Sequence, residues 1–175
     1  MTAHADQRRE PGAAAPGWTL RAAEPDDVEP IAELRAQVMR PDLERLGRFD
    51  EHRVRQRLRD SFSPSHTSVI VVADGVFAGA DGVFPGAHGV FAGCVTLRPA
   101  EDGQWLEHFY LDPALQGRGL GSAVLSRLLA RTDADHTPVR LNVLRGSAAQ
   151  HLYERHGFSV EDEDPIDVYM VRRPA

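Results

Sequence analysis

Apolar and polar residues recur along the chain with two different periods, and these periods predict a series of strands and helices. Trp18 to Ala22 and Thr67 to Ala73 are short runs typical of strands. Between them, the helix-start signal Pro25-Asp26-Asp27 precedes apolar residues at helical spacing from Val28 to Met39. A second helical pattern runs from about Asp50 to Phe62, with apolar residues four positions apart.

The second half of the chain continues this alternation. It predicts strands at 105–111, 139–144 and 167–171, with helices at 120–131 and 147–156. The first of these helices carries an apolar stripe at Val124, Leu125, Leu128 and Leu129. Strands that alternate with helices at these lengths indicate a mixed α/β sheet in one domain, residues 18–173.

Two segments depart from this pattern. Residues 1–17 are rich in Ala, Pro, Gly and charge without periodicity, so we expect a disordered tail. Residues 74–94 contain one heptapeptide three times; without two copies, Asp74-Gly75 would close an ordinary hairpin onto the strand ending at 94–97. The 14 surplus residues predict a lengthened or partly mobile hairpin tip. We interpret it as a tolerated duplication without function, although its phenylalanines could fold over the domain or meet a partner chain.

Composition narrows the class of protein. With 175 residues and 42% hydrophobic content, the chain fits one globular domain, and its net charge of -6 argues against nucleic-acid binding. The single cysteine, Cys94, excludes an internal disulfide and Cys/His metal spacing, so no metal is expected. No apolar run is long enough for a membrane span, and the N-terminus carries Asp6, Arg8, Arg9 and Glu10 where a signal core would be apolar. We therefore expect a cytoplasmic protein with no membrane partner.

The segment from Leu111 to Ser122 joins a strand to a helix through a glycine-rich turn. Without Cβ atoms at 117, 119 and 121, backbone N–H groups can approach an anion closely, and the helix adds the positive end of its dipole. The spacing is G-x-G-x-G rather than the G-x-G-x-x-G of dinucleotide sites, and no lysine follows as in a P-loop. The turn thus predicts phosphate binding of a different kind.

Two motifs resemble those of the GNAT superfamily of N-acetyltransferases. Gln116-Gly117-Arg118-Gly119-Leu120-Gly121 is similar to its coenzyme A loop, Gln/Arg-x-x-Gly-x-Gly/Ala, and Tyr153-Glu154-Arg155-His156-Gly157-Phe158 is similar to its Tyr-Glu-x-x-Gly-Phe segment. The two occur in the family's order, and the resemblance extends over most of residues 18–173. It implies a mostly antiparallel sheet flanked by helices, whose central strands splay apart around the thioester arm of acetyl-CoA.

The resemblance also implies which residues contact acetyl-CoA. Backbone N–H groups of the 116–121 turn would hold the diphosphate, with an exposed charge contact from Arg118, and backbone groups of 109–111 would pair with the pantetheine amides. Relatives often place Asn at the start of the helix that carries the tyrosine; here Ser147 stands there, and Asn142 is a candidate for the missing amide. The expected cofactor-binding residues are Phe109, Tyr110, Leu111, Gln116, Gly117, Arg118, Gly119, Leu120, Gly121, Asn142 and Ser147.

Acetyl transfer to an amine needs a proton donor for the leaving thiolate and a route for the amine's proton. Tyr153 is the expected acid, because an unperturbed phenol, with a pKa near 10, stays protonated at neutral pH. The proton of the amine could pass to Glu107, to His108 or to solvent. In a regular strand these two side chains face opposite ways, so at most one enters the cleft unless a bulge intervenes, and we prefer Glu107.

The acceptor is expected to bind at the first two helices and the loop between them, residues 39–50. Arg40, Arg45 and Arg48 are candidates for a carboxylate, and Asp42 or Glu44 for an ammonium; Arg40 and Glu107 are the substrate-binding residues that we select. The predicted function is direct transfer of acetyl from acetyl-CoA to a primary amine of a small molecule or peptide. The alternatives are a module that binds acyl-CoA without turnover and a Rossmann-like nucleotide binder with a parallel sheet. A homodimer is left open.

Overall fold

The computed structural model describes residues 17–73, 85–86 and 89–174. The tail expected at 1–17 lies outside the described residues except for its last position. Most of the repeat at 74–94 lies outside them too, including the expected hairpin tip. The third copy is described from residue 89 onward, where it already belongs to a strand.

The helices and strands predicted from the hydrophobic pattern are present, with bounds close to those expected. The helices are α1 (Val28–Arg45), α2 (Glu51–Ser61), α3 (Leu120–Ala134) and α4 (Ala149–Arg155), with short 3₁₀ turns at Pro25–Asp27, Pro64–His66 and Pro113–Leu115. The strands are β1 (Trp18–Ala22), β2 (Thr67–Val72), β3 (Pro85–Gly86), β4 (Gly89–Ala100), β5 (Gly103–Leu111), β6 (Val139–Leu144), β7 (Ser159–Glu163) and β8 (Asp167–Arg172).

The strands form one mixed sheet in the order β1-β2-β4-β5-β6-β8-β7, with β3 beside β4. Every neighbouring pair is antiparallel except β5 and β6, which are parallel. This confirms the mixed, mostly antiparallel α/β class. It also excludes a Rossmann-like fold, which requires a parallel sheet.

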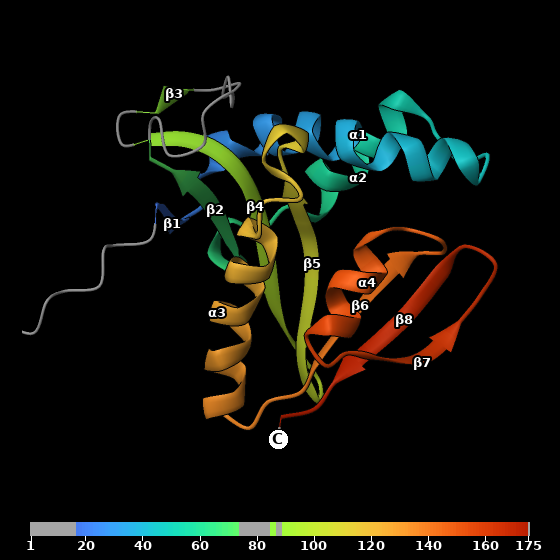
Figure 1. The fold of residues 1–175 in the computed structure, drawn as a ribbon. Helices are drawn as coiled ribbons and strands as arrows, with labels where there is room; N and C mark the ends of the chain where they lie inside the picture. The colour runs from blue at the N-terminus through green and yellow to red at the C-terminus, as the bar shows by residue number, and fades with distance from the viewer. Residues whose placement is uncertain (1–16, 74–84, 87–88, 175) are drawn as a thin grey trace, which may run out of the picture.

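The two central strands separate soon after they meet. Within the described residues, β5 pairs with β6 only at Gln104–Val139 and Trp105–Arg140, although β5 continues to Leu111. The strands lie together at the bottom of Figure 1 and diverge toward its top. The splayed centre that the resemblance implied is therefore present, and it leaves the upper edge of β5 without a neighbouring strand on that side.

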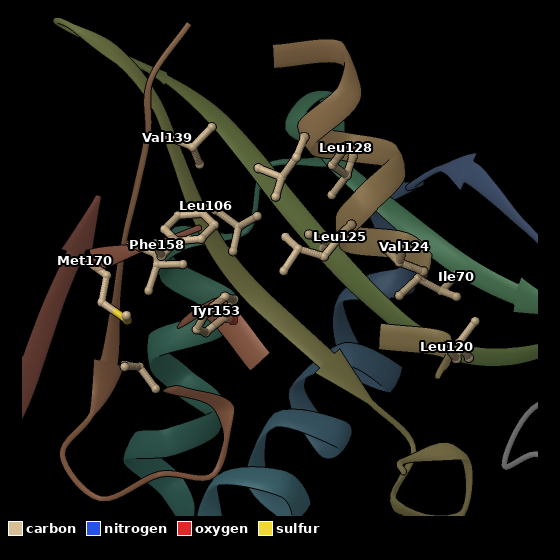
Figure 2. Packing of buried hydrophobic residues seen from close by; sticks show 14 of the residues in the cluster. Ile70, Leu106, Leu120, Val124, Leu125, Leu128, Val139, Tyr153, Phe158 and Met170 are labelled. Atoms are coloured by element: carbon tan, nitrogen blue, oxygen red, sulfur yellow. The ribbon is translucent and has the colours of Figure 1, made fainter. Parts of the chain in front are cut away.

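Two apolar cores cover the two faces of the sheet. On one face, α3 and α4 pack their buried residues against β2, β4, β5, β6 and β8; Figure 2 shows this packing around Leu125, Leu106 and Tyr153. On the other face, α1 and α2 contribute Ile31 and Leu58 to a smaller core with Cys94. The expected stripe of α3 is buried, and Leu125 is fully enclosed. Its truncation to Ala would cost about 2–5 kcal/mol.

Two elements differ from the sequence expectation. The helix α1 continues to Arg45 and includes Pro41, which lies on its exposed side, so the loop before α2 is only 46–50. Ion pairs from Arg40 to Glu44 and from Arg45 to Asp42 stabilise this last part of the helix. The strand β7 was not predicted, because all its residues are exposed and four of the five are polar.

Candidate active site

The turn between β5 and α3 presents a row of unbonded backbone donors. The carbonyl of Gly119 accepts from Ala123 N–H, so the intrahelical bonds of α3 begin only there. Within the described part of the chain, the N–H groups of residues 117–122 donate to no protein acceptor. Six consecutive free donors at the N-terminus of a 15-residue helix form a cradle suited to a diphosphate.

Two glycines shape this cradle. Gly117 and Gly119 have φ angles of 73° and 84°, which L side chains rarely adopt, and a Cβ on either would meet no atom of the described residues within 4 Å. Their role is therefore in the backbone conformation and in the open space that they leave for a ligand. Gln116 does not contribute a free donor, because its N–H donates to Pro113 and its side-chain amide to the carbonyl of Leu111.

The third glycine brings α3 close to its neighbours. A Cβ on Gly121 would lie 3.2 Å from Leu111 Cδ1 and 3.7 Å from a methyl group of Leu152 on α4. His156, just after α4, adds a polar link, since its Nδ1 donates to the carbonyl of Leu152 and its Nε2 accepts from Ser122 Oγ at 3.0 Å. The helix that carries Tyr153 is thus fixed against the first turns of α3.

Tyr153 lies beside the opening between the central strands. In Figure 2 its ring lies between the ribbons of β5 and β6, and it packs edge-on against Phe158 with 5.7 Å between ring centroids. The side chain is buried, and within the described residues its hydroxyl makes no hydrogen bond. Burial raises the pKa of this phenol above its ordinary value, and the nearby Tyr110 adds to the shift. Tyr153 therefore remains protonated at neutral pH.

A β-bulge at His108 determines where the two candidate bases lie. Cys94 pairs with Tyr110 and Thr96 with Glu107, so two residues of β5, His108 and Phe109, face one residue of β4. His108 has a φ of 50°, an uncommon angle for a residue with a side chain. As a result, Glu107 and His108 point to the same face, that of α1 and α2, whereas consecutive residues of a regular strand would point to opposite faces.

The environments of these two side chains differ. Glu107 Oε1 accepts from Arg98 at 2.8 Å, while Oε2 accepts no hydrogen bond within the described residues. His108 is nearly enclosed, with both ring nitrogens engaged: Nε2 lies 3.0 Å from Ser61 Oγ and Nδ1 lies 3.2 Å from the Tyr110 hydroxyl. Burial lowers the pKa of His108 to about 4, with Glu107 opposing the shift and Arg35 and Arg98 adding to it. The imidazole is neutral at physiological pH.

Beyond Trp105, β5 pairs with no residue of β6 within the described part of the chain. The side chains of Phe109 and Leu111 pack with the core on the α3 side, and that of Tyr110 packs with the core on the α1 side. Arg118 and Leu120 complete the expected loop residues; Arg118 is exposed and Leu120 is buried beneath the first turn of α3.

The remaining predicted residues are already engaged with protein groups. Arg40 donates to Glu51 at 2.5 Å and to Glu44, and its guanidinium lies over the ring of Phe49. Asn142 is exposed and donates to Asp167 at 2.8 Å. Ser147 Oγ accepts from the N–H of Ala149, the first residue of α4, at 3.3 Å.

Several residues of the site were not anticipated from the sequence. They are Arg35 on α1, Ser61 at the end of α2 and Arg98 on β4. In the sequence, nothing distinguishes these arginines from ordinary surface charges. Arg45, an expected candidate for a carboxylate, donates to the carbonyl of Arg145 at 2.6 Å and packs on Gly146. In the described residues no group of three or more His, Cys, Asp or Glu side chains is arranged to hold a metal ion. None of the described helices is long and apolar enough to cross a bilayer.

Comparison with known proteins bears on the family and on the fold of the chain. The model of the acetyltransferase (GNAT) domain matches residues 66–160, more than half of the chain. The PaiA N-acetyltransferase of Thermoplasma acidophilum, solved with coenzyme A, has a TM-score of 0.64 at 18% identity, over 89% of this chain and 98% of that one. The ribosomal-protein-S18-alanine N-acetyltransferase of Escherichia coli has a TM-score of 0.61 at 16% identity, over 90% and 94%. No curated protein sequence matches the chain.

Proposed function

Because the chain belongs to the GNAT acetyltransferases, which take their acyl group from acyl-CoA, we propose that it acetylates a primary amine of a small molecule or peptide. The transfer would be a direct attack of the amine on acetyl-CoA within a ternary complex. The observation that carries this proposal is the cradle of six free N–H groups beside the splayed strands, with Tyr153 at the same opening.

Acetyl-CoA would supply the thioester, and the turn would hold its diphosphate. The donors from Gly117 to Ser122 and the dipole of α3 provide complementary charge, and the exposed Arg118 adds a cation. The open space above Gly117 and Gly119 leaves room for close approach of the phosphates. The free edge of β5 at 109–111 would pair with the amides of the pantetheine arm, as a strand partner does.

Tyr153 would donate a proton to the leaving thiolate. Its raised pKa keeps the proton in place until negative charge develops beside it. Within the described residues no protein acceptor competes for its hydroxyl hydrogen. A phenol that is buried, protonated and free to donate meets the requirements for a general acid at this opening.

Glu107 is the better of the two candidate bases. Its Oε2 is free within the described residues to accept a proton directly or through water, and Arg98 holds the other oxygen. Both nitrogens of His108 are occupied, and its pKa of about 4 makes it a weak base at neutral pH. Glu107 and His108 face the side of the sheet opposite α3, so the amine would approach from the face covered by α1 and α2.

The proposal is tested by measuring acetyl-CoA binding calorimetrically and then release of free thiol across a panel of amines. The panel should contain small primary amines, amino acids and peptides with free N-termini. We expect binding, and turnover with at least one class of amine. Binding without turnover on any acceptor would favour a module that only holds acyl-CoA, and absence of binding would refute the proposal.

The base is identified by pH–rate profiles of Glu107→Gln and His108→Ala. We expect Glu107→Gln to remove the acidic limb of kcat/KM and His108→Ala to retain it. The opposite result would assign the base to His108, and an acidic limb retained in both variants would assign proton removal to solvent.

A further inference from the structure

A chain of hydrogen bonds leads from helix α1 to the bulge of β5. Arg35 on α1 donates through Nε to the carbonyl of Val54 at 2.9 Å and through a terminal nitrogen to the hydroxyl of Tyr110. The Tyr110 hydroxyl lies 3.2 Å from His108 Nδ1. On the far side of the imidazole, Nε2 lies 3.0 Å from Ser61 Oγ. The four side chains come from three different elements.

The donors and acceptors in this series of hydrogen bonds favour one direction of donation, from Arg35 through Tyr110 to His108 and on to Ser61. The Ser61 hydroxyl lies 2.8 Å from the carbonyl of Arg57, a strong acceptor for its hydrogen, so Ser61 Oγ is left to accept from His108 Nε2–H. The Tyr110 oxygen accepts from Arg35 and its hydrogen then points to His108 Nδ1; the alternative acceptor, Met39 Sδ, is weaker and 3.7 Å away. In this direction the Tyr110 hydroxyl, both ring nitrogens of His108 and the Ser61 hydroxyl all have partners, and the imidazole is neutral with its proton on Nε2.

The imidazole that receives these bonds belongs to a residue whose backbone is strained. His108 has a φ of 50°, and its carbonyl accepts from the thiol of Cys94 at 3.1 Å. A positive φ at a residue with a Cβ persists only where its surroundings hold it, and such strain is characteristic of functional sites. Here the side chain is held at both ring nitrogens and the carbonyl is held by the thiol.

We propose that Arg35 is a positioning residue of the active site, which acts through Tyr110 to fix the His108 imidazole and thereby the bulge that directs Glu107 toward the amine. This inference rests on the proposed function. It assigns to Arg35 no contact with either substrate. Loss of Arg35 should therefore lower kcat and leave binding of acetyl-CoA unchanged, because the phosphate cradle lies on the other face of the sheet.

The test compares Arg35→Gln with Arg55→Gln in the full chain. Both arginines connect α1 and α2, but Arg55 does so through an ion pair with Glu33 and does not contact Tyr110. We expect Arg35→Gln to lower kcat about tenfold, with KM for acetyl-CoA within about twofold of the unmodified protein, and Arg55→Gln to retain kcat. Equal effects of the two substitutions on kcat would overturn the proposal.

Nitrogen-15 NMR of the His108 ring gives a readout that does not depend on turnover. In the unmodified protein we expect a single neutral tautomer protonated at Nε2, which titrates near pH 4. In Arg35→Gln the ring should exchange between tautomers and titrate at higher pH, because the Nδ1 partner is no longer oriented and a nearby positive charge is gone. The groups that face this ring are Arg35, Ser61, Cys94, Arg98, Glu107 and Tyr110.

A second variant covers the case in which Arg35→Gln does not fold. Tyr110→Phe keeps the ring in the core and removes only the hydroxyl that faces His108 Nδ1. It should produce the same exchange between tautomers and the same selective loss of kcat, whereas the part of the titration shift that comes from the lost charge should appear in Arg35→Gln alone. An unchanged His108 spectrum in both variants would overturn the proposal even if activity fell. If the unmodified protein acetylated no amine, the proposed function would fail. The His108 spectrum would still show whether Arg35 and Tyr110 orient the imidazole, so the two failures are distinguishable.

Discussion

Replacement of Gly119 by Ala tests the phosphate cradle most directly. Gly119 precedes the first residue of α3 with φ 84° and ψ −4°, and a Cβ there would contact no atom within 4 Å in the part of the chain that the structure describes. The methyl group therefore introduces no clash, and its cost comes from the backbone conformation alone. The left-handed region costs a residue with a Cβ about 1–2 kcal/mol, which is the expected loss in the free energy of unfolding.

The effect on acetyl-CoA should be larger than this loss of stability suggests. If the turn relaxes to relieve the strain, the N–H groups of 117–122 no longer converge, and the added methyl occupies space that the phosphates need. A hydrogen bond to a charged group contributes about 1.5–3 kcal/mol, so loss of one such bond should raise Kd about 10-fold to 150-fold.

Gly47→Ala is the matched control. Gly47 follows α1 with a φ of 66°, and a Cβ there would also meet no described atom within 4 Å, so its conformational cost is similar. Urea unfolding should give comparable losses of stability for the two variants, and calorimetry should show weaker acetyl-CoA binding for Gly119→Ala alone. A Kd for Gly119→Ala within twofold of that of Gly47→Ala would refute the argument that this turn holds the diphosphate.

Three further predictions follow from buried groups. Tyr153→Phe should lower kcat at least 100-fold with little change in the Kd of acetyl-CoA. Unchanged turnover, measured as the release of free thiol from acetyl-CoA, would exclude Tyr153 as the acid. The lowered pKa of His108 means that the unfolded chain binds a proton between about pH 6.5 and 4 that the folded chain does not. Stability should therefore fall by up to about 3 kcal/mol as the pH falls through this window, and urea unfolding of His108→Gln should lack that part of the decrease. Burial raises the pKa of the Cys94 thiol to about 12, so iodoacetamide should modify it only in denaturant, and rapid alkylation of the folded protein at pH 7 would contradict the buried location.

The features that the sequence predicted well are those with local causes. The apolar stripe of α3 and the glycines before it specify a helix and its N-terminal turn within a few residues, and both are present. The row of free N–H donors is nevertheless shifted by one position, from the expected residues 116–121 to residues 117–122. The N–H of Gln116 donates to the carbonyl of Pro113, and the N–H of Ser122 is free within the described residues.

The features that the sequence did not reveal depend on partners far along the chain. The bulge at His108 is held by Ser61, 47 positions earlier, and Arg35 meets a tyrosine 75 positions later. No local pattern distinguishes Arg35 from the surface arginines of the same helices. The strand β7 was missed for the opposite reason: it buries no side chain, and charged residues suit an edge strand that must not pair with another molecule.

The brief pairing of β5 and β6 has a mechanical consequence. Two residue pairs of β5 and β6 are the sheet's main hydrogen-bonded connection between its N-terminal portion and the β6-β8-β7 portion. The sheet should therefore open most readily along this boundary, and within the sheet the backbone amides beside it should exchange hydrogen fastest. A ligand that lay along this boundary and formed hydrogen bonds with both portions would hold them together. Protection of β6 amides in the presence of acetyl-CoA should then rise together with that of β5, as the two portions begin to open as one cooperative unit.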